Sequence, residues 1–150
     1  MRNINAIAAL SLSLTTLVSC GSSSQNINGF WMGQVKNPDN SLALTFTTNM
    51  TQGSGSSVNV SNFNFGGPVA CFTSGFGEIA TFHSAASSKG FQTGSFAMTV
   101  STAFPFAVNN VLALQGTRNP DGSISGTWAL TGQPGCSGAG NFTMNIPPPV

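Results

Sequence analysis

Few side chains of this 150-residue chain could carry out acid–base or nucleophilic chemistry. It has one histidine, His83, and three carboxylates, of which Asp39 and Asp121 lie in Asn-Pro-Asp turn sequences that account for them. Glu78 lies five residues before His83, so a regular strand would place the two on opposite faces. A hydrolase would need Glu78, His83 and a hydroxyl to converge, and no Gly-x-Ser-x-Gly sequence precedes a predicted helix. We therefore predict a protein that is not an enzyme and needs no cofactor.

The first of three cysteines follows what looks like an export signal. Arg2 supplies positive charge, and an apolar run interrupted by Ser and Thr extends from Ile4 to Val18. This run is too short to span a bilayer, which takes about 20 predominantly apolar residues. Its end, Leu17-Val18-Ser19-Cys20, resembles the lipobox of bacterial lipoproteins, in which the cysteine is acylated and becomes the new N-terminus after cleavage. An ordinary signal peptide that contains a cysteine is the alternative.

The resemblance implies that Cys20 carries palmitate-type acyl chains that anchor the protein to a membrane. Two or three such chains hold a protein stably, because each buried CH₂ contributes about 0.8 kcal/mol. The chain then divides into a signal peptide (1–19), an acylated cysteine with a flexible tether (20–28), a β domain (29–146) and a proline tail (147–150). In this family an Asp after the cysteine favours the inner membrane, so Gly21 implies the outer membrane of a bacterial envelope.

The other two cysteines, Cys71 and Cys136, form an even pair, which in an oxidising envelope predicts one disulfide. They lie 65 positions apart. Closing a loop of that size constrains the unfolded chain by roughly 4 kcal/mol in the chain-entropy model. A metal site is the competing interpretation, but the chain has one histidine and no third thiol nearby.

Charged residues are only 5% of the chain. After the signal peptide, three basic residues balance three acidic ones, namely Lys36, Lys89 and Arg118 against Asp39, Glu78 and Asp121. Nucleic-acid binding requires clustered Lys or Arg, so this composition excludes it. A polybasic membrane-binding surface is excluded for the same reason. Membrane contact is therefore expected through lipid.

Apolar and polar residues alternate along much of the chain, in segments bounded by Gly, Pro, Asn or Asp. Leu42, Leu44 and Phe46 alternate with polar or small residues, for example, as expected for strands with one buried face. The pattern predicts eight strands, near 30–36, 41–50, 57–65, 77–84, 91–101, 107–117, 123–131 and 140–146.

The third of these segments changes phase. Val58 and Val60 occupy even positions, whereas Phe63 and Phe65 occupy odd ones. An extra residue near positions 61 and 62 would restore the phase as a β-bulge. Two separate strands with a turn at Asn62 are the alternative.

Eight consecutive strands with short connections and no crossover helix predict an all-β, antiparallel up-and-down barrel, whose closure removes exposed edges. A two-sheet β-sandwich is the alternative. The sequences Gly29-Phe30-Trp31-Met32-Gly33 and Gly126-Thr127-Trp128 resemble the Gly-x-Trp strands of lipocalins and avidin-like barrels. With Cys71 and the Cys136-Ser137-Gly138-Ala139-Gly140-Asn141-Phe142 ending, the chain is more specifically similar to small uncharacterised bacterial lipoproteins of the meander-barrel type. The later Thr-Asp-Tyr and closing Arg motifs of lipocalins are missing, so their ligand function is not implied.

Trp31 and Trp128 could border a ligand pocket, since an eight-stranded barrel is just wide enough to be filled by side chains or to hold one small molecule. Our leading hypothesis is a membrane-anchored envelope lipoprotein with a non-enzymatic structural or interaction role. The alternative is a carrier or sensor that binds a small apolar ligand inside the barrel. An internal cavity bordered by either tryptophan would favour this alternative.

Overall fold

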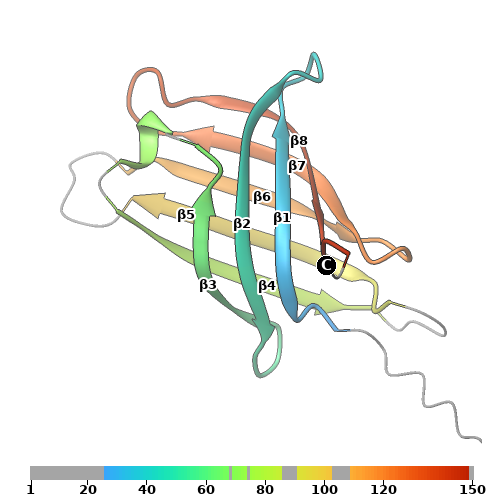
Figure 1. Ribbon diagram of the computed structural model, residues 1–150. Helices are drawn as coiled ribbons and strands as arrows, with labels where there is room; N and C mark the ends of the chain where they lie inside the picture. The colour runs from blue at the N-terminus through green and yellow to red at the C-terminus, as the bar shows by residue number, and fades with distance from the viewer. Residues whose placement is uncertain (1–25, 68, 74, 86–90, 103–108, 149–150) are drawn as a thin grey trace, which may run out of the picture.

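The computed structural model describes residues 26–67, 69–73, 75–85, 91–102 and 109–148. Within these ranges eight antiparallel strands form a closed barrel, in which each strand pairs with the next and the last returns to the first (Figure 1). The strands are β1 (Gly29–Lys36), β2 (Leu42–Gln52), β3 (Ser57–Phe65), β4 (Phe76–Ser84), β5 (Gly94–Thr102), β6 (Val111–Arg118), β7 (Ile124–Thr131) and β8 (Gly138–Asn145). The predicted up-and-down barrel is confirmed, and the sandwich alternative is wrong.

The strand boundaries agree with the sequence prediction to within a few residues, with two consequences for the interior. β6 begins at Val111 and ends at Arg118, whereas positions 107–117 were expected. Asn110 therefore lies before the strand and Arg118 lies within it. A short 3₁₀ helix, η1 (Ala70–Phe72), was not predicted, and it carries Cys71 between β3 and β4.

Large side chains fill the inside of the barrel, because the alternation along each strand sends one set inward. The largest fully buried ones are Trp31, Arg118, Phe46, Phe82, Phe142, Ile27, Met50, Met98, Leu112, Leu114, Ile124 and Met144. Arg118 is the one charged residue among those in the described ranges that are buried.

The two Asn-Pro-Asp sequences form equivalent turns at opposite ends of the barrel, one between β1 and β2 and one between β6 and β7. A side-chain oxygen of Asp39 accepts hydrogen bonds from the backbone N–H and the hydroxyl of Ser41, at 3.0 and 2.6 Å. Asp121 accepts the same two bonds from Ser123, at 2.9 and 2.6 Å. These hydrogen bonds lower the pKa of both carboxyl groups, so the predicted turn role of both aspartates is confirmed.

The β-bulge predicted in the third strand is present. The register between β2 and β3 shifts by one residue between Thr47 and Asn49, so β3 contains one residue more than its partner there. Asn62 takes up the extra length with a φ of 53°. The hydroxyl of the buried Thr48 donates a hydrogen bond to the carbonyl of Ser61 at 3.2 Å. This bond joins β2 to β3 where the bulge interrupts their backbone pairing.

β3 and β4 are joined by fewer backbone pairs than β4 and β5. β3 and β4 pair at two described positions, near the beginning of β3, whereas β4 pairs with β5 at nine. Farther along, side chains replace the backbone ladder: the rings of Phe63, Phe65, Phe72 and Phe76 form a cluster in which the centroids of contacting rings lie 5.0 to 6.1 Å apart. These contacts join β3, η1 and β4 through aromatic packing.

Candidate functional site

The two tryptophans expected to border a ligand pocket lie at opposite ends of the barrel. Trp31 is fully buried near the start of β1, and its Nε1–H donates to the carbonyl of Ile27 at 2.9 Å. Trp128 is 5% exposed near the far end of β7, and its Nε1–H donates to the carbonyl of Lys36 at 2.7 Å. Both indole N–H groups are therefore used by the protein's own backbone.

Arg118 lies inside the barrel beside Trp31. Its guanidinium carbon is 5.8 Å from the centroid of the Trp31 ring and 5.2 Å from that of Phe91, distances at which a cation is attracted to an aromatic face. The side chain is 1% exposed, and burial lowers the pKa of Arg118. A buried arginine keeps its positive charge, because the guanidinium group is not deprotonated in proteins.

Sequence reasoning missed this arginine because it counted Arg118 only in the balance of charges. The position had a usable feature, since Arg118 shares even parity with the buried Leu112 and Leu114 on the same strand. Ending the predicted strand one residue early removed it from that pattern.

Trp128 packs across two glycines of β8. A Cβ at Gly138 would lie 2.7 Å from the far edge of the indole, and one at Gly140 would lie 2.8 Å from its Nε1. Atoms at those distances would clash, so the two glycines make room for the ring. Trp128 thus reaches over β8 to Lys36 and fills this end of the barrel.

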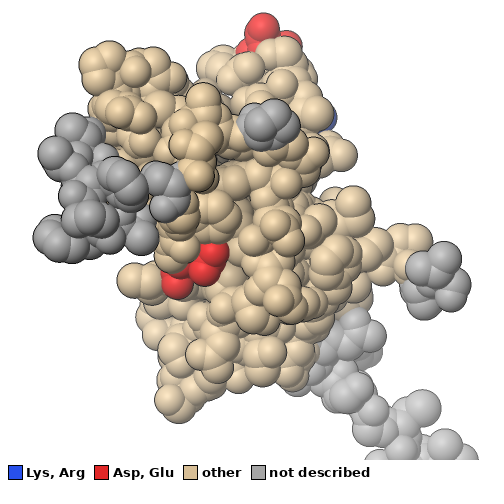
Figure 2. Space-filling model, turned by 60° about the vertical axis from the view of Figure 1, so that its left-hand side comes forward, with Lys and Arg blue, Asp and Glu red and all other residues tan. Residues whose placement is uncertain are grey.

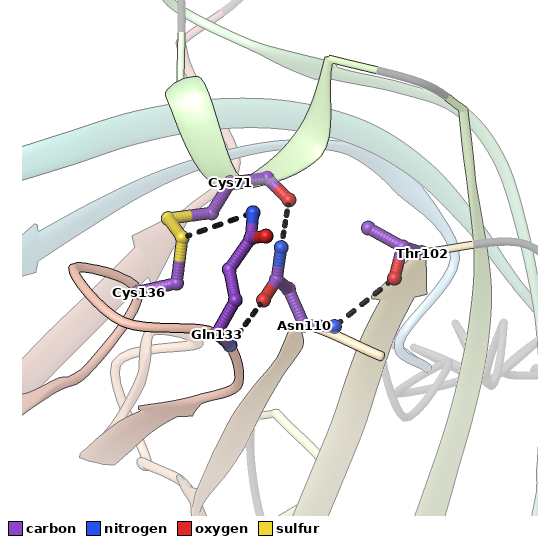
Figure 3. Close-up of a disulfide and its surroundings, with 5 residues drawn as sticks. All are labelled: Cys71, Thr102, Asn110, Gln133 and Cys136. Atoms are coloured by element: carbon purple, nitrogen blue, oxygen red, sulfur yellow. Dashed lines mark hydrogen bonds between the residues drawn. A yellow bond between two sulfur atoms is a disulfide. The ribbon is translucent and has the colours of Figure 1, made fainter. Parts of the chain in front are cut away.

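The predicted disulfide between Cys71 and Cys136 is confirmed, with a Cα–Cα distance of 5.7 Å. It joins η1 to the connection between β7 and β8. Beside it lies the buried Asn110, whose side-chain N–H donates to the Cys71 carbonyl at 2.8 Å and whose side-chain oxygen accepts from the Gln133 N–H at 2.9 Å (Figure 3). The backbone N–H of Asn110 also donates to the Thr102 hydroxyl at 3.0 Å. One side chain therefore ties together three connections.

No local sequence pattern distinguished Asn110, because asparagine is common in connections and its partners are far away in the chain. Its neighbour Asn109 is exposed. Only the folded structure distinguishes the buried Asn110 from the exposed Asn109.

Glu78 and His83 do not form a catalytic pair. Glu78 pairs across the sheet with the fully buried Val100, so it lies on the inward face of β4, and partial burial raises its pKa. His83 is exposed and pairs with Ser95 on the outer face. The strand separates the two side chains, as the five-residue spacing predicted.

Cys20 lies outside the described residues. Just after it, the prediction that positions 20–28 form a flexible tether is wrong for the last two positions. Ile27 is fully buried, and the side-chain oxygen of Asn28 accepts from the Gln52 N–H at 2.6 Å. Packing against the barrel therefore begins before β1, because the Ile27 carbonyl and side chain complete the surroundings of Trp31.

Grooves on the described surface lie along the outer wall. One of about 470 Å³ is lined by residues 32–34 of β1 and 45–47 of β2, which include the buried Phe46, together with Gly66, Asn145, Pro147 and Pro148. Another, of about 320 Å³, surrounds His83 on β4, β5 and β6. Neither Trp31 nor Trp128 lines either groove. Both tryptophans instead pack among the buried side chains of the core.

The surface is nearly uncharged. Figure 2 shows a face on which acidic atoms occupy two separate places and basic atoms are visible only at the edge. Among the residues that the structure describes, no group of three or more His, Cys, Asp or Glu side chains could hold a metal ion. In the same part of the chain, no helix is long and apolar enough to cross a bilayer.

Comparison with protein-family models, with curated proteins and with solved structures finds no match to this chain.

Proposed function

We propose that this chain is a lipoprotein of the bacterial envelope, anchored through acyl chains on Cys20, with a structural or interaction role that involves no catalysis. The observation that carries the proposal is the lipobox-like Leu17-Val18-Ser19-Cys20 sequence at the end of an apolar run. The disulfide supports it, because Cys71 and Cys136 pair with each other and Cys20 is the remaining one of three cysteines.

Two further features support an anchored domain outside the cytoplasm. A structural disulfide is typical of proteins in oxidising compartments. Only positions 21–25 separate Cys20 from Asn26, where the described chain begins, so an acylated Cys20 would hold the barrel close to the membrane.

The arrangement of ionisable groups supports a role without catalysis. The carboxylates of Asp39 and Asp121 accept hydrogen bonds from serine hydroxyls within turns. Glu78 and His83 lie on opposite faces of β4. General acid–base catalysis needs such groups within hydrogen-bond reach of one substrate.

Metabolic labelling with an alkyne analogue of palmitate tests the anchor. The full-length precursor is expressed in a bacterium with two membranes, as wild type, as Cys20→Ser and as the matched control Ser24→Ala. We expect wild type and Ser24→Ala to incorporate the label and to be found in the membrane fraction. Cys20→Ser protein should neither incorporate the label nor be found in that fraction. The Cys71–Cys136 disulfide, read from gel mobility with and without reductant, should still form in exported Cys20→Ser protein.

Wild-type protein without label would overturn the proposal, as would Cys20→Ser protein that remains in the membrane after a salt wash. The proposed outer-membrane location has its own test. Sucrose-gradient fractionation should find wild type with the outer membrane, and Gly21→Asp should move it to the inner membrane. Wild type at the inner membrane would refute the location and leave the anchor intact.

A further inference from the structure

Three large apolar side chains are exposed together where the described chain begins and ends. Phe30 and Met32 point outward from β1 and are 43% and 50% exposed. Ile146 follows β8 and is 43% exposed. We call these three residues the β1 apolar patch.

Pairing between β1 and β8 brings Ile146 to the same end of the barrel as Phe30 and Met32. Met32 pairs with Asn145, which places Ile146 beside the start of β1. A Cβ on Gly29 would lie 3.4 Å from Cδ1 of Ile146, so the Ile146 side chain covers that glycine. Figure 1 shows the C-terminal end of the chain next to the beginning of β1.

The groove of about 470 Å³ extends the patch along the outer wall. Met32 lines it together with the proline tail, Pro147 and Pro148. The described polar residues that line it are uncharged, namely Gln34, Thr45, Thr47 and Asn145. The whole surface is therefore apolar or neutral, which suits insertion among lipid headgroups without attraction to anionic lipid.

The length of chain before the structure limits where this surface can lie. Cys20 precedes Asn26 by six residues, which span at most about 20 Å when fully extended. Phe30 follows Asn26 by only four residues. If Cys20 is acylated, the patch is thus held near the bilayer that receives the acyl chains.

We propose that the β1 apolar patch rests on this bilayer, so that the barrel docks on the lipid surface in one orientation. The inference rests on the proposed anchor and adds a contact surface to it. A lipid surface is the favoured occupant because it is the one partner that the short link brings to the patch, and because the patch has no charge to steer a charged protein.

Two other exposed apolar residues serve as internal controls. Leu42 is 59% exposed at the start of β2, at the opposite end of the barrel. Ile79 is 75% exposed on the outer face of β4. Neither adjoins β1 at the patch, so docking in the proposed orientation leaves both in water.

Hydroxyl-radical footprinting tests the orientation. The acylated full-length mature protein is reconstituted in phosphatidylcholine vesicles and compared with Cys20→Ser protein in solution, and oxidation is read by peptide mass spectrometry. We expect Phe30, Met32 and Ile146 to react at least about threefold more slowly in the vesicle sample. Leu42 and Ile79 should react equally in both. The buried Met50, Met98 and Met144 should react slowly in both.

Each other outcome has a definite meaning. An acylated N-terminal peptide with unchanged patch reactivity overturns docking and leaves the anchor intact, whereas an N-terminal peptide without acyl chains overturns the proposed function. Protection of the patch in concentrated Cys20→Ser protein without vesicles identifies a second copy of this chain as the occupant, and the bilayer proposal is then wrong.

A charged variant gives a second, independent readout. Met32→Lys changes an outward side chain, so the barrel should fold and remain anchored through Cys20. In vesicles, the reactivity of Phe30 and Ile146 should rise towards the solution value. Ile79→Lys on the opposite wall is the matched control and should leave both unchanged. Equal protection in Met32→Lys and wild type would overturn the proposal.

Discussion

The two ends of the barrel are closed by different means. At the terminal end, where β1 begins and β8 finishes, large side chains pack together around Trp31 and Arg118. At the disulfide end, the Cys71–Cys136 bond and the hydrogen bonds of Asn110 link the connections to one another.

The connections that the disulfide joins are longer than two of the turns at the terminal end. At the terminal end, β2 and β3 are joined by residues 53–56, and β6 and β7 by 119–123. At the disulfide end, residues 66–75 join β3 to β4, and 132–137 join β7 to β8. Longer connections lose more conformational entropy on folding and bury more backbone groups that need partners. A covalent link and a buried amide stabilise the connections 66–75 and 132–137.

Removing the central side chain of the terminal end should have the largest effect. Trp31→Ala should lower the free energy of unfolding by about 3–5 kcal/mol, because it opens a cavity and leaves the Ile27 carbonyl without its donor. Urea unfolding of Trp31→Ala beside wild type measures it. Trp31→Phe keeps a ring and should lose less, and the exposed Phe30→Ala should stay within about 0.5 kcal/mol of wild type. Equal losses in Trp31→Ala and Phe30→Ala would contradict the packing account.

Breaking the disulfide should come next and should affect the other end. The double substitution Cys71→Ser with Cys136→Ser should cost about 2–4 kcal/mol. Hydrogen exchange should become faster in η1 and at the start of β8, while amides near Trp31 keep their relative protection. Uniform acceleration around the barrel would show that the two ends do not behave independently.

Asn110→Ala should cost about 1–3 kcal/mol, since the Cys71 carbonyl and the Gln133 N–H lose a buried partner. The exposed neighbour Asn109 provides a control of the same residue type, and Asn109→Ala should be nearly neutral. Because Asn110 and the disulfide share Cys71, their combined loss should be smaller than the sum of the separate losses. Strict additivity would argue against one linked network.

The two aspartate turns should show the smallest effect and no difference between the ends. Their hydrogen bonds lower the folded pKa of Asp39 and Asp121, so each stabilises the fold above the unfolded pKa of about 4 and loses that contribution as pH falls through the folded value. Asp39→Asn and Asp121→Asn should each flatten the acid side of the curve of stability against pH, by similar amounts. Thermal melts between pH 2 and pH 6 measure this. A response in only one variant would show that the turns differ.

Much of the fold was predictable because side-chain parity is a local property of a strand. The bulge at Asn62 followed from the phase change between Val60 and Phe63. The burial of Arg118 did not follow, because a charge is normally placed outside and its aromatic neighbour Trp31 belongs to a distant strand. The role of Ile27 was hidden for a similar reason, since its polar surroundings in the sequence resemble a linker.

The sequence by itself determined the eight strands, the turns between them and the disulfide between Cys71 and Cys136, because each depends on local alternation, turn chemistry or a count. Only the tertiary structure decided what closes each end of the barrel, that β3 and β4 meet largely through phenylalanine rings, and that Ile146 comes to lie at the same end of the barrel as Phe30 and Met32. These features depend on which distant strands become neighbours when the barrel closes, and the pairing of β1 with β8 is made only in the folded chain.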